Sequence, residues 1–394
     1  MKILLIETLG DGGIAHYTYN LAKALVKNNN SVHLFTSAKY EFENRNESFK
    51  VFPRMFGFTE YLIRFIPYLK GAKPLPSLLR RMLKLLEYPL NSLQALKLAV
   101  EHEIQIIHFQ SVNWIELLMV VLFKLGGFKI IYTIHNIVPH HKKLRLYHVI
   151  IYKILYGLCH RLIIHSEKGK EEVIGIFGVA REKIFVIPHG DYKFFIPKKE
   201  LTKKEAKEIL KIPLHCRTLL FFGAIRPNKG LDQAIDILDQ VTKYITNIRL
   251  MIVGELWENF DRYEKQIKKY NIQNNIYTHL QYVTNEELPK YFIASDIVLL
   301  PYYEITGSGV LQIAYAFSKP VVATDLDCFR EVIDDGKNGY LVSKKDHVQF
   351  AERIVEILND DTKKKYMGQH SRLLADTRYS WDTISKETIQ VYAI

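Results

Sequence analysis

The feature that most constrains this chain is the segment 296–325, DIVLLPYYEITGSGVLQIAYAFSKPVVATD. It predicts a buried strand at 297–300, a turn with small residues at 307–309, an apolar helix at 310–317 and a second buried strand at 321–323. A strand that passes through small residues into a helix leaves unpaired N–H groups at the positive end of the helix dipole. The segment therefore predicts an anion site at the start of this helix.

Glu304 lies in the turn just ahead of that helix start. A carboxylate at this position would repel a phosphate that was bound alone. It can, however, accept hydrogen bonds from the hydroxyl groups of a ligand whose phosphates lie alongside. A sugar nucleotide has both groups, and we expect such a ligand.

Glu304 and Gln312, with Thr306-Gly307 between them and KPVVATD after them, resemble the E-x7-E region of retaining glycosyltransferases of family 4. The downstream segments EVIDDG (331–336) and NGYLV (338–342) continue the resemblance. Gln312 is a departure, since the family usually has a second Glu there. The resemblance is specific over the C-terminal half and weaker over the N-terminal half, and it points to enzymes of bacterial polysaccharide and glycolipid assembly.

Short apolar strands alternate with amphipathic helices along the whole chain, which favours an α/β fold with parallel sheets. The strands are expected at 3–6, 32–35, 104–109, 129–134, 162–165, 184–187, 219–222, 249–253, 275–280, 297–300 and 321–323. A length of 394 residues suits two domains. The resemblance implies the GT-B fold: two doubly wound, Rossmann-like domains facing a cleft, and a C-terminal helix that crosses back to the first domain.

We therefore expect an acceptor-side domain at 1–195, a nucleotide-sugar-binding domain at 196–378 and the returning helix at 379–394. The Lys-rich stretch 197–211 would link the two domains.

The loop after the first strand, LGDGGI, places Gly12 and Gly13 before a helix. Glycines allow close approach of the backbone to a ligand, but the G-x-G-x-x-G spacing of dinucleotide sites is missing. The resemblance implies that this pair faces the donor diphosphate.

Two cations and one histidine follow predicted strands. Arg226 and Lys229, in FFGAIRPNKGLD, can converge on one diphosphate, and the resemblance implies that they stabilise the leaving nucleoside diphosphate. His135, in YTIHNIVPH, matches the family's histidine close to the donor sugar. A role as general base does not follow, because the donor phosphate is thought to take the acceptor proton in this class.

The resemblance also implies a set of substrate contacts. Glu304 would orient the sugar, Gln312 would meet the ribose, and Tyr282 with Val283 would lie near the base. Backbone N–H groups would come from the segment that contains Thr306, Gly307, Ser308, Gly309 and Val310.

Composition excludes several other classes. The chain has 48% hydrophobic residues and no uninterrupted apolar run long enough to span a bilayer. Its start, KILLIE, resembles a strand, so we expect no signal peptide. Three widely spaced cysteines favour a reducing cytoplasm and support neither a disulfide framework nor zinc. We expect no metal and no cofactor, and Asp325-Leu326-Asp327 is interpreted as a loop.

The net charge of +12 is concentrated in two segments. Residues 60–100 carry seven Lys/Arg against two Glu, and residues 139–170 carry seven against one Glu, both mixed with aromatic residues and leucines. This mixture fits an anionic membrane surface, although ordinary helices with solvated basic faces would give the same pattern. No motif supports nucleic-acid binding.

These observations predict a metal-independent retaining hexosyltransferase with a UDP- or GDP-linked sugar as donor. Its acceptor would be a lipid-linked glycan precursor at the inner face of the cell membrane. A transferase with a soluble acceptor and a non-catalytic sugar-nucleotide sensor remain as alternatives, the second suggested only by Gln312.

Overall fold

The computed structural model describes residues 1–42, 48–65, 76–110, 114–135, 137, 146–305 and 308–393. The chain divides into two compact units, Met1–His189 with Trp381–Ile394 and Gly190–Ser380. Each is an α/β unit built on one parallel sheet, as the alternating pattern predicts.

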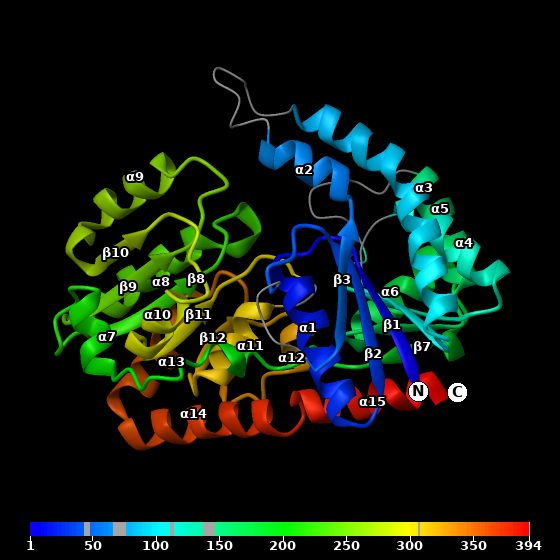
Figure 1. Cartoon of the computed structure of the whole chain (residues 1–394). Coiled ribbons are helices and arrows are strands. Elements are labelled where there is room, and N and C mark those ends of the chain that lie inside the picture. The colour runs from blue at the N-terminus through cyan, green and yellow to red at the C-terminus, as the bar shows by residue number, and fades with distance from the viewer. Residues whose placement is uncertain are drawn as a thin grey trace. The chain divides into compact units, whose positions relative to one another are not determined.

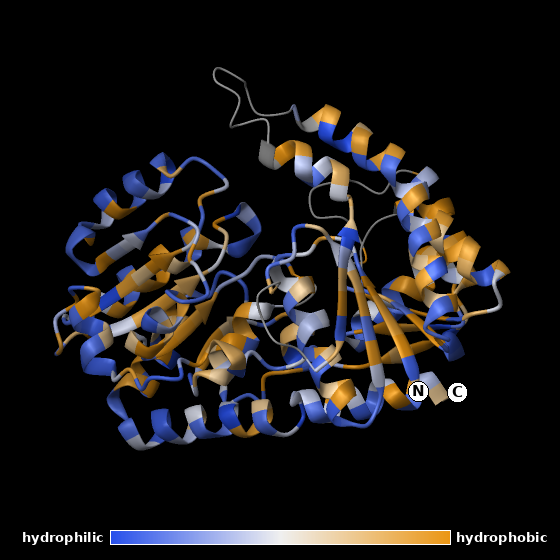
Figure 2. Ribbon diagram, in the orientation of Figure 1, coloured by the Kyte–Doolittle hydropathy of each residue, from blue (hydrophilic) through white to orange (hydrophobic). Residues whose placement is uncertain are grey.

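The first unit has a seven-stranded sheet in the order β3-β2-β1-β4-β5-β6-β7 (Figure 1). Its strands are β1 (Lys2–Glu7), β2 (Ser31–Ser37), β3 (Lys50–Met55), β4 (Ile106–Phe109), β5 (Lys129–Ile134), β6 (Arg161–Ile164) and β7 (Ile184–Val186). The central strands are apolar and buried, as expected of a parallel sheet covered on both faces, and they appear in orange in Figure 2.

Helices cover both faces of this sheet. Those described are α1 (Gly12–Lys27), α2 (Gly57–Phe65), α3 (Ser77–Glu101), η2 (Trp114–Glu116), α4 (Leu117–Leu125), α5 (Leu146–Leu158), α6 (Glu167–Phe177), η3 (Arg181–Lys183) and α15 (Trp381–Ala393). One apolar core holds residues of α1 and α15, and another holds residues of α3, α4, α5 and α6.

The C-terminal helix α15 therefore belongs to the first unit. It lies against α1, where Asn28 Nδ2 donates to Ser385 Oγ at 2.9 Å. The Tyr392 hydroxyl lies 2.6 Å from His108 Nδ1, and Lys129 Nζ donates to the Tyr392 carbonyl at 2.7 Å.

The second unit has a six-stranded sheet in the order β10-β9-β8-β11-β12-β13. Its strands are β8 (Arg217–Phe222), β9 (Ile248–Val253), β10 (Ile276–His279), β11 (Ile297–Leu300), β12 (Val321–Thr324) and β13 (Gly339–Val342). Its helices are η4 (Lys193–Phe195), α7 (Lys203–Ile209), η5 (Pro227–Lys229), α8 (Leu231–Thr242), α9 (Asp261–Tyr270), η6 (Gln273–Asn275), α10 (Leu288–Ala294), α11 (Gly309–Ala316), α12 (Asp327–Arg330), α13 (His347–Asn359) and α14 (Asp361–Asp376).

All eleven predicted strands are present, with bounds shifted by at most two residues at either end. Strands β3 and β13 were not predicted. Both are edge strands. The sequence of β3, KVFPRM, contains a proline and no continuous apolar run. Proline is tolerated at the edge of a sheet because one side of an edge strand forms no ladder hydrogen bonds.

The second unit begins at Gly190, and the residues that follow Gly190 contact residues at the C-terminal end of the same unit. Asp191 N donates to the Tyr379 carbonyl at 2.8 Å, and Lys193 Nζ pairs with Asp376 at 2.7 Å. Across the described residues, no helix combines the length and the apolar character that crossing a bilayer requires.

Candidate active site

Each sheet reverses its strand order at one place, and ligands of such sheets bind outside the carboxyl ends of the strands at that place. In the second unit the reversal lies between β8 and β11, which pair in parallel. Arg226 and Lys229 follow β8, and Glu304 follows β11. The structure therefore brings these three predicted residues to one edge of one sheet.

Two glycines allow the loops at this edge to approach each other. A Cβ atom on Gly254, after β9, would lie 2.1 Å from the Gly223 carbonyl oxygen, and one on Gly230 would lie 2.0 Å from the Pro301 carbonyl oxygen. Both glycines also have positive φ angles, 142° and 68°. Only glycine fits at these positions, because the backbones of neighbouring loops lie so close to each other.

Arg226 and Lys229 lie on aromatic faces. The guanidinium carbon of Arg226 is 3.8 Å from the centroid of Trp257, and Lys229 Nζ is 3.9 Å from the centroid of Tyr302. Within the described ranges neither cation forms an ion pair, and Arg226 Nε is buried without a hydrogen-bond partner. A cation held by a π face keeps its charge available for an anion.

Burial also changes the acid–base chemistry of this pair. It lowers the pKa of Lys229 to about 7, with a further contribution from the nearby Arg226 charge. Burial lowers the pKa of Arg226 below its ordinary value as well. Both shifts would be reversed by a bound anion, because an opposite charge favours the protonated form.

Glu304 is joined to the cation loop through Asn228. The Asn228 side chain donates to the Glu304 carbonyl at 3.3 Å, and Tyr303 N donates to the Asn228 carbonyl at 2.9 Å. The Glu304 carboxylate itself is exposed. The Glu304 backbone is therefore joined to the loop that carries the two cations, and its carboxylate remains accessible to hydroxyl groups of a ligand.

Helix α11 begins where the sequence predicts the anion site. Ser308 caps it by accepting from Leu311 N at 3.4 Å, and a Cβ on Gly309 would come within 3.3 Å of the Tyr192 hydroxyl. Val310 lies 3.5 Å from the position of a Cβ on Gly223, so the first turn of α11 adjoins the loop after β8. Thr306 and Gly307 lie outside the described residues.

Gln312 is on α11 and is only 5% exposed. Its Oε1 atom is buried and has no hydrogen-bond partner among the described residues. A buried amide oxygen without a partner is costly, so this atom is suited to accept a hydrogen bond from a ligand hydroxyl.

Tyr282 and Val283 follow β10, the edge strand on the β9 side. Tyr282 is exposed, whereas Val283 packs into the core of the second unit. The structure places them at the same edge of the sheet as Arg226 and Glu304, two strands away from β8.

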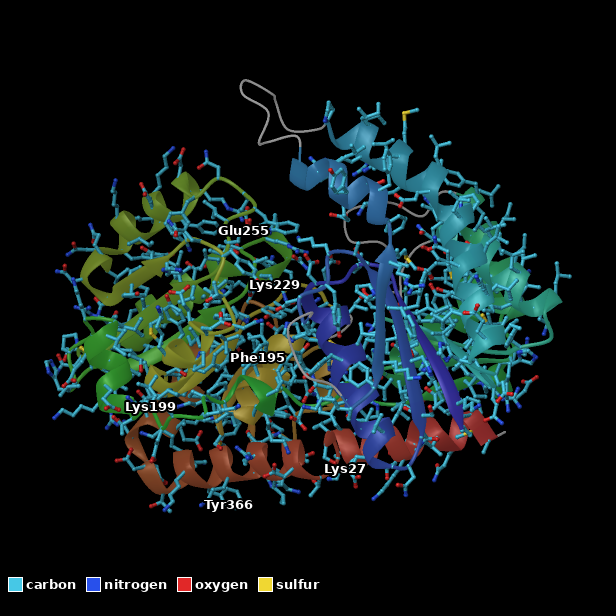
Figure 3. All side chains as sticks on the ribbon, viewed as in Figure 1. Lys27, Phe195, Lys199, Lys229, Glu255 and Tyr366 are labelled. Carbon is cyan, nitrogen blue, oxygen red and sulfur yellow. The ribbon has the colours of Figure 1, made fainter. Side chains whose placement is uncertain are left out.

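The loop after β9 contributes two residues that the sequence did not single out. Trp257 Nε1 donates to Glu255 Oε2 at 2.8 Å, and Ile225 N donates to the Glu255 carbonyl at 2.8 Å. These bonds fasten this loop to the loop that carries Arg226, and Figure 3 labels Glu255 and Lys229 there. The signal that could have found Trp257 is a large aromatic residue just after a predicted strand.

In the first unit, Gly12 and Gly13 begin α1, after the turn that follows β1. Buried Glu7 holds the preceding turn by accepting from Leu9 N at 2.6 Å and from Gly10 N at 2.8 Å. The Gly12 N–H donates to Glu41 Oε2 at 3.3 Å. This helix start is therefore met by a carboxylate of the chain itself.

His135 follows β5 and lies in a group of aromatic rings. The ring of Tyr17 lies 4.8 Å from His135, 5.2 Å from His165 and 5.0 Å from His189, measured between centroids. Burial is the main cause that lowers the pKa of His135 well below its ordinary value and that of His165 to about 3. His135 is thus neutral at physiological pH. His165 also ends a predicted strand, which could have drawn attention to it.

The described part of the chain contains no group of three or more His, Cys, Asp or Glu side chains arranged to hold a metal ion. Asp325 and Asp327 both pair with Arg330, at 2.5 and 3.3 Å.

Two family profiles match the chain. The profile described as Glycosyltransferase Family 4 matches residues 11–190, and the profile described as Glycosyl transferases group 1 matches residues 202–373. The first match ends one residue beyond His189, the boundary of the first unit, and the second match lies within the second unit.

Curated relatives are distant. The spore coat protein SA of Bacillus subtilis is 24% identical over 242 residues, covering 59% of this chain and 64% of the relative. The phosphatidyl-myo-inositol mannosyltransferase of Mycobacterium leprae is 28% identical over 193 residues, covering 48% of this chain and 49% of the relative. The matches span less than two thirds of the length of these relatives.

Among solved structures, HepE from Anabaena in complex with UDP and glucose superposes with a TM-score of 0.73 at 19% sequence identity. The match covers 100% of this chain and 99% of that protein. This similarity confirms the predicted α/β fold of the GT-B type.

Proposed function

Because the chain belongs to the family 4 glycosyltransferases, we propose that it transfers a hexose from a nucleotide diphosphate sugar with retention of the anomeric configuration. The observation that carries this proposal is the pair Arg226 and Lys229, which lie on aromatic faces in a loop that Asn228 joins to the Glu304 backbone. The second unit would bind the sugar nucleotide and the first unit the acceptor.

The cations would act on the leaving group. As the bond between the sugar C1 and the phosphate oxygen breaks, negative charge develops on the diphosphate. Arg226, Lys229 and the N–H groups at the start of α11 would stabilise it, the kind of preorganised electrostatic contribution that is usually largest in catalysis. We propose that no metal is needed, since these cations supply the neutralisation. Gly12 and Gly13 would add N–H groups facing the diphosphate.

Retention would follow from attack on the same face from which the diphosphate leaves. The acceptor oxygen bonds to C1, and its proton passes to an oxygen of the departing phosphate, so that no protein base is required. His135 and Glu304 would position the sugar through its hydroxyl groups, because both can accept hydrogen bonds when His135 is neutral.

The nucleoside would be held by three residues at the same sheet edge. The unpartnered Gln312 Oε1 would accept from a ribose hydroxyl, while Tyr282 and Val283 would lie against the base. We propose a UDP- or GDP-linked donor, and HepE, whose structure contains UDP, supports the first of these.

The experiment that tests this function is the Glu304→Ala variant together with donor-binding measurements. We expect UDP or GDP to raise the Tm of the wild-type protein, because a ligand that binds the native state stabilises it. Glu304→Ala should retain that shift but lower kcat/KM by about 100-fold. Normal kcat/KM in a folded Glu304→Ala variant would contradict the assigned role.

The proposed acceptor is a lipid-linked glycan precursor, and helix α3 supports it. On α3, exposed large apolar residues recur at helical spacing: Leu78, Met82, Leu85, Leu86, Leu90 and Leu93. Figure 2 shows this helix with mixed orange and blue residues. An apolar stripe of this kind beside basic residues fits a peripheral position on an anionic membrane surface.

The described basic residues of this region differ in exposure and in ion pairing. Lys84 pairs with Glu60 at 2.6 Å, whereas Arg81 is exposed. The basic residues within 66–75 and 139–145 lie outside the described residues. The apolar stripe is therefore the sharper target for a test.

We expect the protein to bind vesicles that contain anionic lipid and to be released by salt. The double variant Leu86→Ser and Leu90→Ser should weaken binding and transfer to a lipid-linked acceptor, while donor hydrolysis continues. Leu373→Ser changes a similarly exposed leucine of the second unit and serves as the control. If the wild-type protein does not bind such vesicles at low salt, a soluble acceptor becomes the better proposal.

A further inference from the structure

The loop after β9 is fixed against the loop after β8 by its backbone. Ile225 N donates to the Glu255 carbonyl at 2.8 Å, and Trp257 N donates to the Ile225 carbonyl at 3.1 Å. Ile225 and Leu256 thereby form a parallel bridge beyond the ends of their strands. Since Ile225 is fully buried, the backbone that carries the Trp257 side chain is held in a fixed position relative to that of Arg226.

The Trp257 side chain makes contacts of two opposite kinds. Its ring lies beneath Arg226, with 3.8 Å between the guanidinium carbon and the ring centroid. Its Nε1 donates to Glu255 Oε2 at 2.8 Å. An indole suits both partners, because its face attracts a cation and its N–H is a hydrogen-bond donor. One side chain therefore lies between a cation and a carboxylate.

Arg226 depends on this ring for its position. Within the described residues its side chain forms no ion pair, and its Nε atom is buried without a hydrogen-bond partner. A buried donor without a partner is costly, so the cation is held there by other contacts. The contact with the Trp257 face is the polar contact that the structure provides for it.

Glu255 is the carboxylate whose charge reaches Arg226. Burial lowers the pKa of Arg226, and the negative charge of Glu255 opposes that shift. Glu255 is exposed, so little packing restrains its side chain, and its Oε2 atom is held by the Trp257 N–H. If Glu255 instead paired directly with Arg226, it would occupy guanidinium donors that a phosphate also needs.

We propose that Trp257 is a positioning residue with two separable actions: its ring holds the Arg226 guanidinium, and its N–H keeps Glu255 from pairing with Arg226. The inference deepens the proposed function and rests on it for the identity of the ligand, the diphosphate of the donor. Trp257 acts through Arg226 and needs no contact with the ligand.

Pyrophosphate is the probe for both actions, because it carries the diphosphate without the nucleoside or the sugar. Its Kd is measured by calorimetry at low ionic strength with the full-length protein. Trp257 is 53% exposed, so its replacement opens no cavity in the core, and an unchanged Tm checks that each variant is folded. Absence of pyrophosphate binding to the wild-type protein would overturn the inference.

The action of the N–H is tested with Trp257→Phe, which keeps an aromatic face and loses the donor. We expect the Kd for pyrophosphate to rise about fivefold, because the released Glu255 competes for Arg226. In a Glu255→Gln background, which has no such competitor, Trp257→Phe should change the Kd by less than about twofold. An unchanged Kd in Trp257→Phe alone, or a fivefold loss that persists in the Glu255→Gln background, would overturn this action.

The action of the ring is tested with Trp257→Ala in the same Glu255→Gln background. We expect the Kd for pyrophosphate to rise and kcat/KM to fall by about tenfold each, since the cation loses its aromatic face. In an Arg226→Ala background the same replacement should have no further effect, because Trp257 acts through Arg226. Equal losses in both backgrounds would contradict the proposal.

These outcomes are separate from those of the proposed function. If Glu304→Ala keeps a normal kcat/KM, the assigned role of Glu304 toward the sugar fails. The pyrophosphate series still decides the two actions of Trp257, because it involves neither the sugar nor its transfer.

Discussion

Helices α1 and α11 both begin just after a parallel strand and small residues, but their starts have different electrostatic surroundings. At α1, the carboxylate of Glu41 lies 3.3 Å from Gly12 N and 3.1 Å from His16 Nε2. Near α11, by contrast, Arg226 and Lys229 lie on aromatic rings instead of carboxylates. Similar local sequences thus give two different helix starts. At α1 the chain itself supplies a negative charge, whereas near α11 the two positive charges remain available to a ligand.

The largest effect should come from removing that positive charge. We expect Arg226→Ala and Lys229→Ala each to lower kcat/KM by about 100-fold with any donor, because both cations act on the leaving diphosphate. Lys290→Ala is the matched control, since Lys290 also lies over a tyrosine ring but pairs with Glu287 at 2.8 Å. A change confined to acceptor affinity would show that the two cations do not bind the diphosphate.

A second prediction concerns pH. Lys229 has a pKa of about 7 in the free protein, and a bound diphosphate should raise it. The affinity for the donor should therefore be constant below about pH 7 and fall by up to about tenfold per pH unit above it, measured by calorimetry with a nucleotide sugar. Lys229→Arg keeps its charge throughout and should lose this dependence. A flat profile in the wild-type protein would contradict the shifted pKa.

Gln312→Glu should have a smaller effect. If Gln312 accepts from the ribose, a carboxylate should strengthen that bond and lower the Kd for UDP by about fivefold, because hydrogen bonds to charged groups are stronger. Binding of pyrophosphate, which has no ribose, should not change. Equal effects on both ligands would mean that the substitution acts on the phosphates and not on the ribose.

The smallest effect should come from the first unit. Glu41→Gln removes the carboxylate at the start of α1 and should tighten donor binding by about two- to threefold, if Gly12 and Gly13 face the diphosphate. Asp11→Asn removes the same charge from the N-cap residue, which pairs with Lys39 at 2.7 Å, and should have less effect. Equal changes in the two variants would indicate a general charge effect.

Much of the fold could be predicted from the sequence because parallel strands buried on both faces are short apolar runs. Strands β3 and β13 carry this signal weakly, because β3 contains a proline and β13 is a four-residue strand that begins with glycine, and neither was predicted. The meeting of Arg226, Lys229 and Glu304 at one sheet edge was predictable for a related reason: each follows a predicted strand, and the carboxyl ends of parallel strands meet at one edge. Trp257 and His165 were not singled out, because the sequence does not show which side chains lie beside them.

The sequence by itself thus determined the order of strands and helices, the family and the chemical types of the candidate site residues. Only the tertiary structure decided that the cations lie on Trp257 and Tyr302, that Glu41 meets the Gly12 N–H, and that His135, His165 and Ile187 form a row. The physical reason is that apolar periodicity is written locally in the chain. Charge, pKa and tautomer depend instead on neighbours that strand pairing brings together from distant positions.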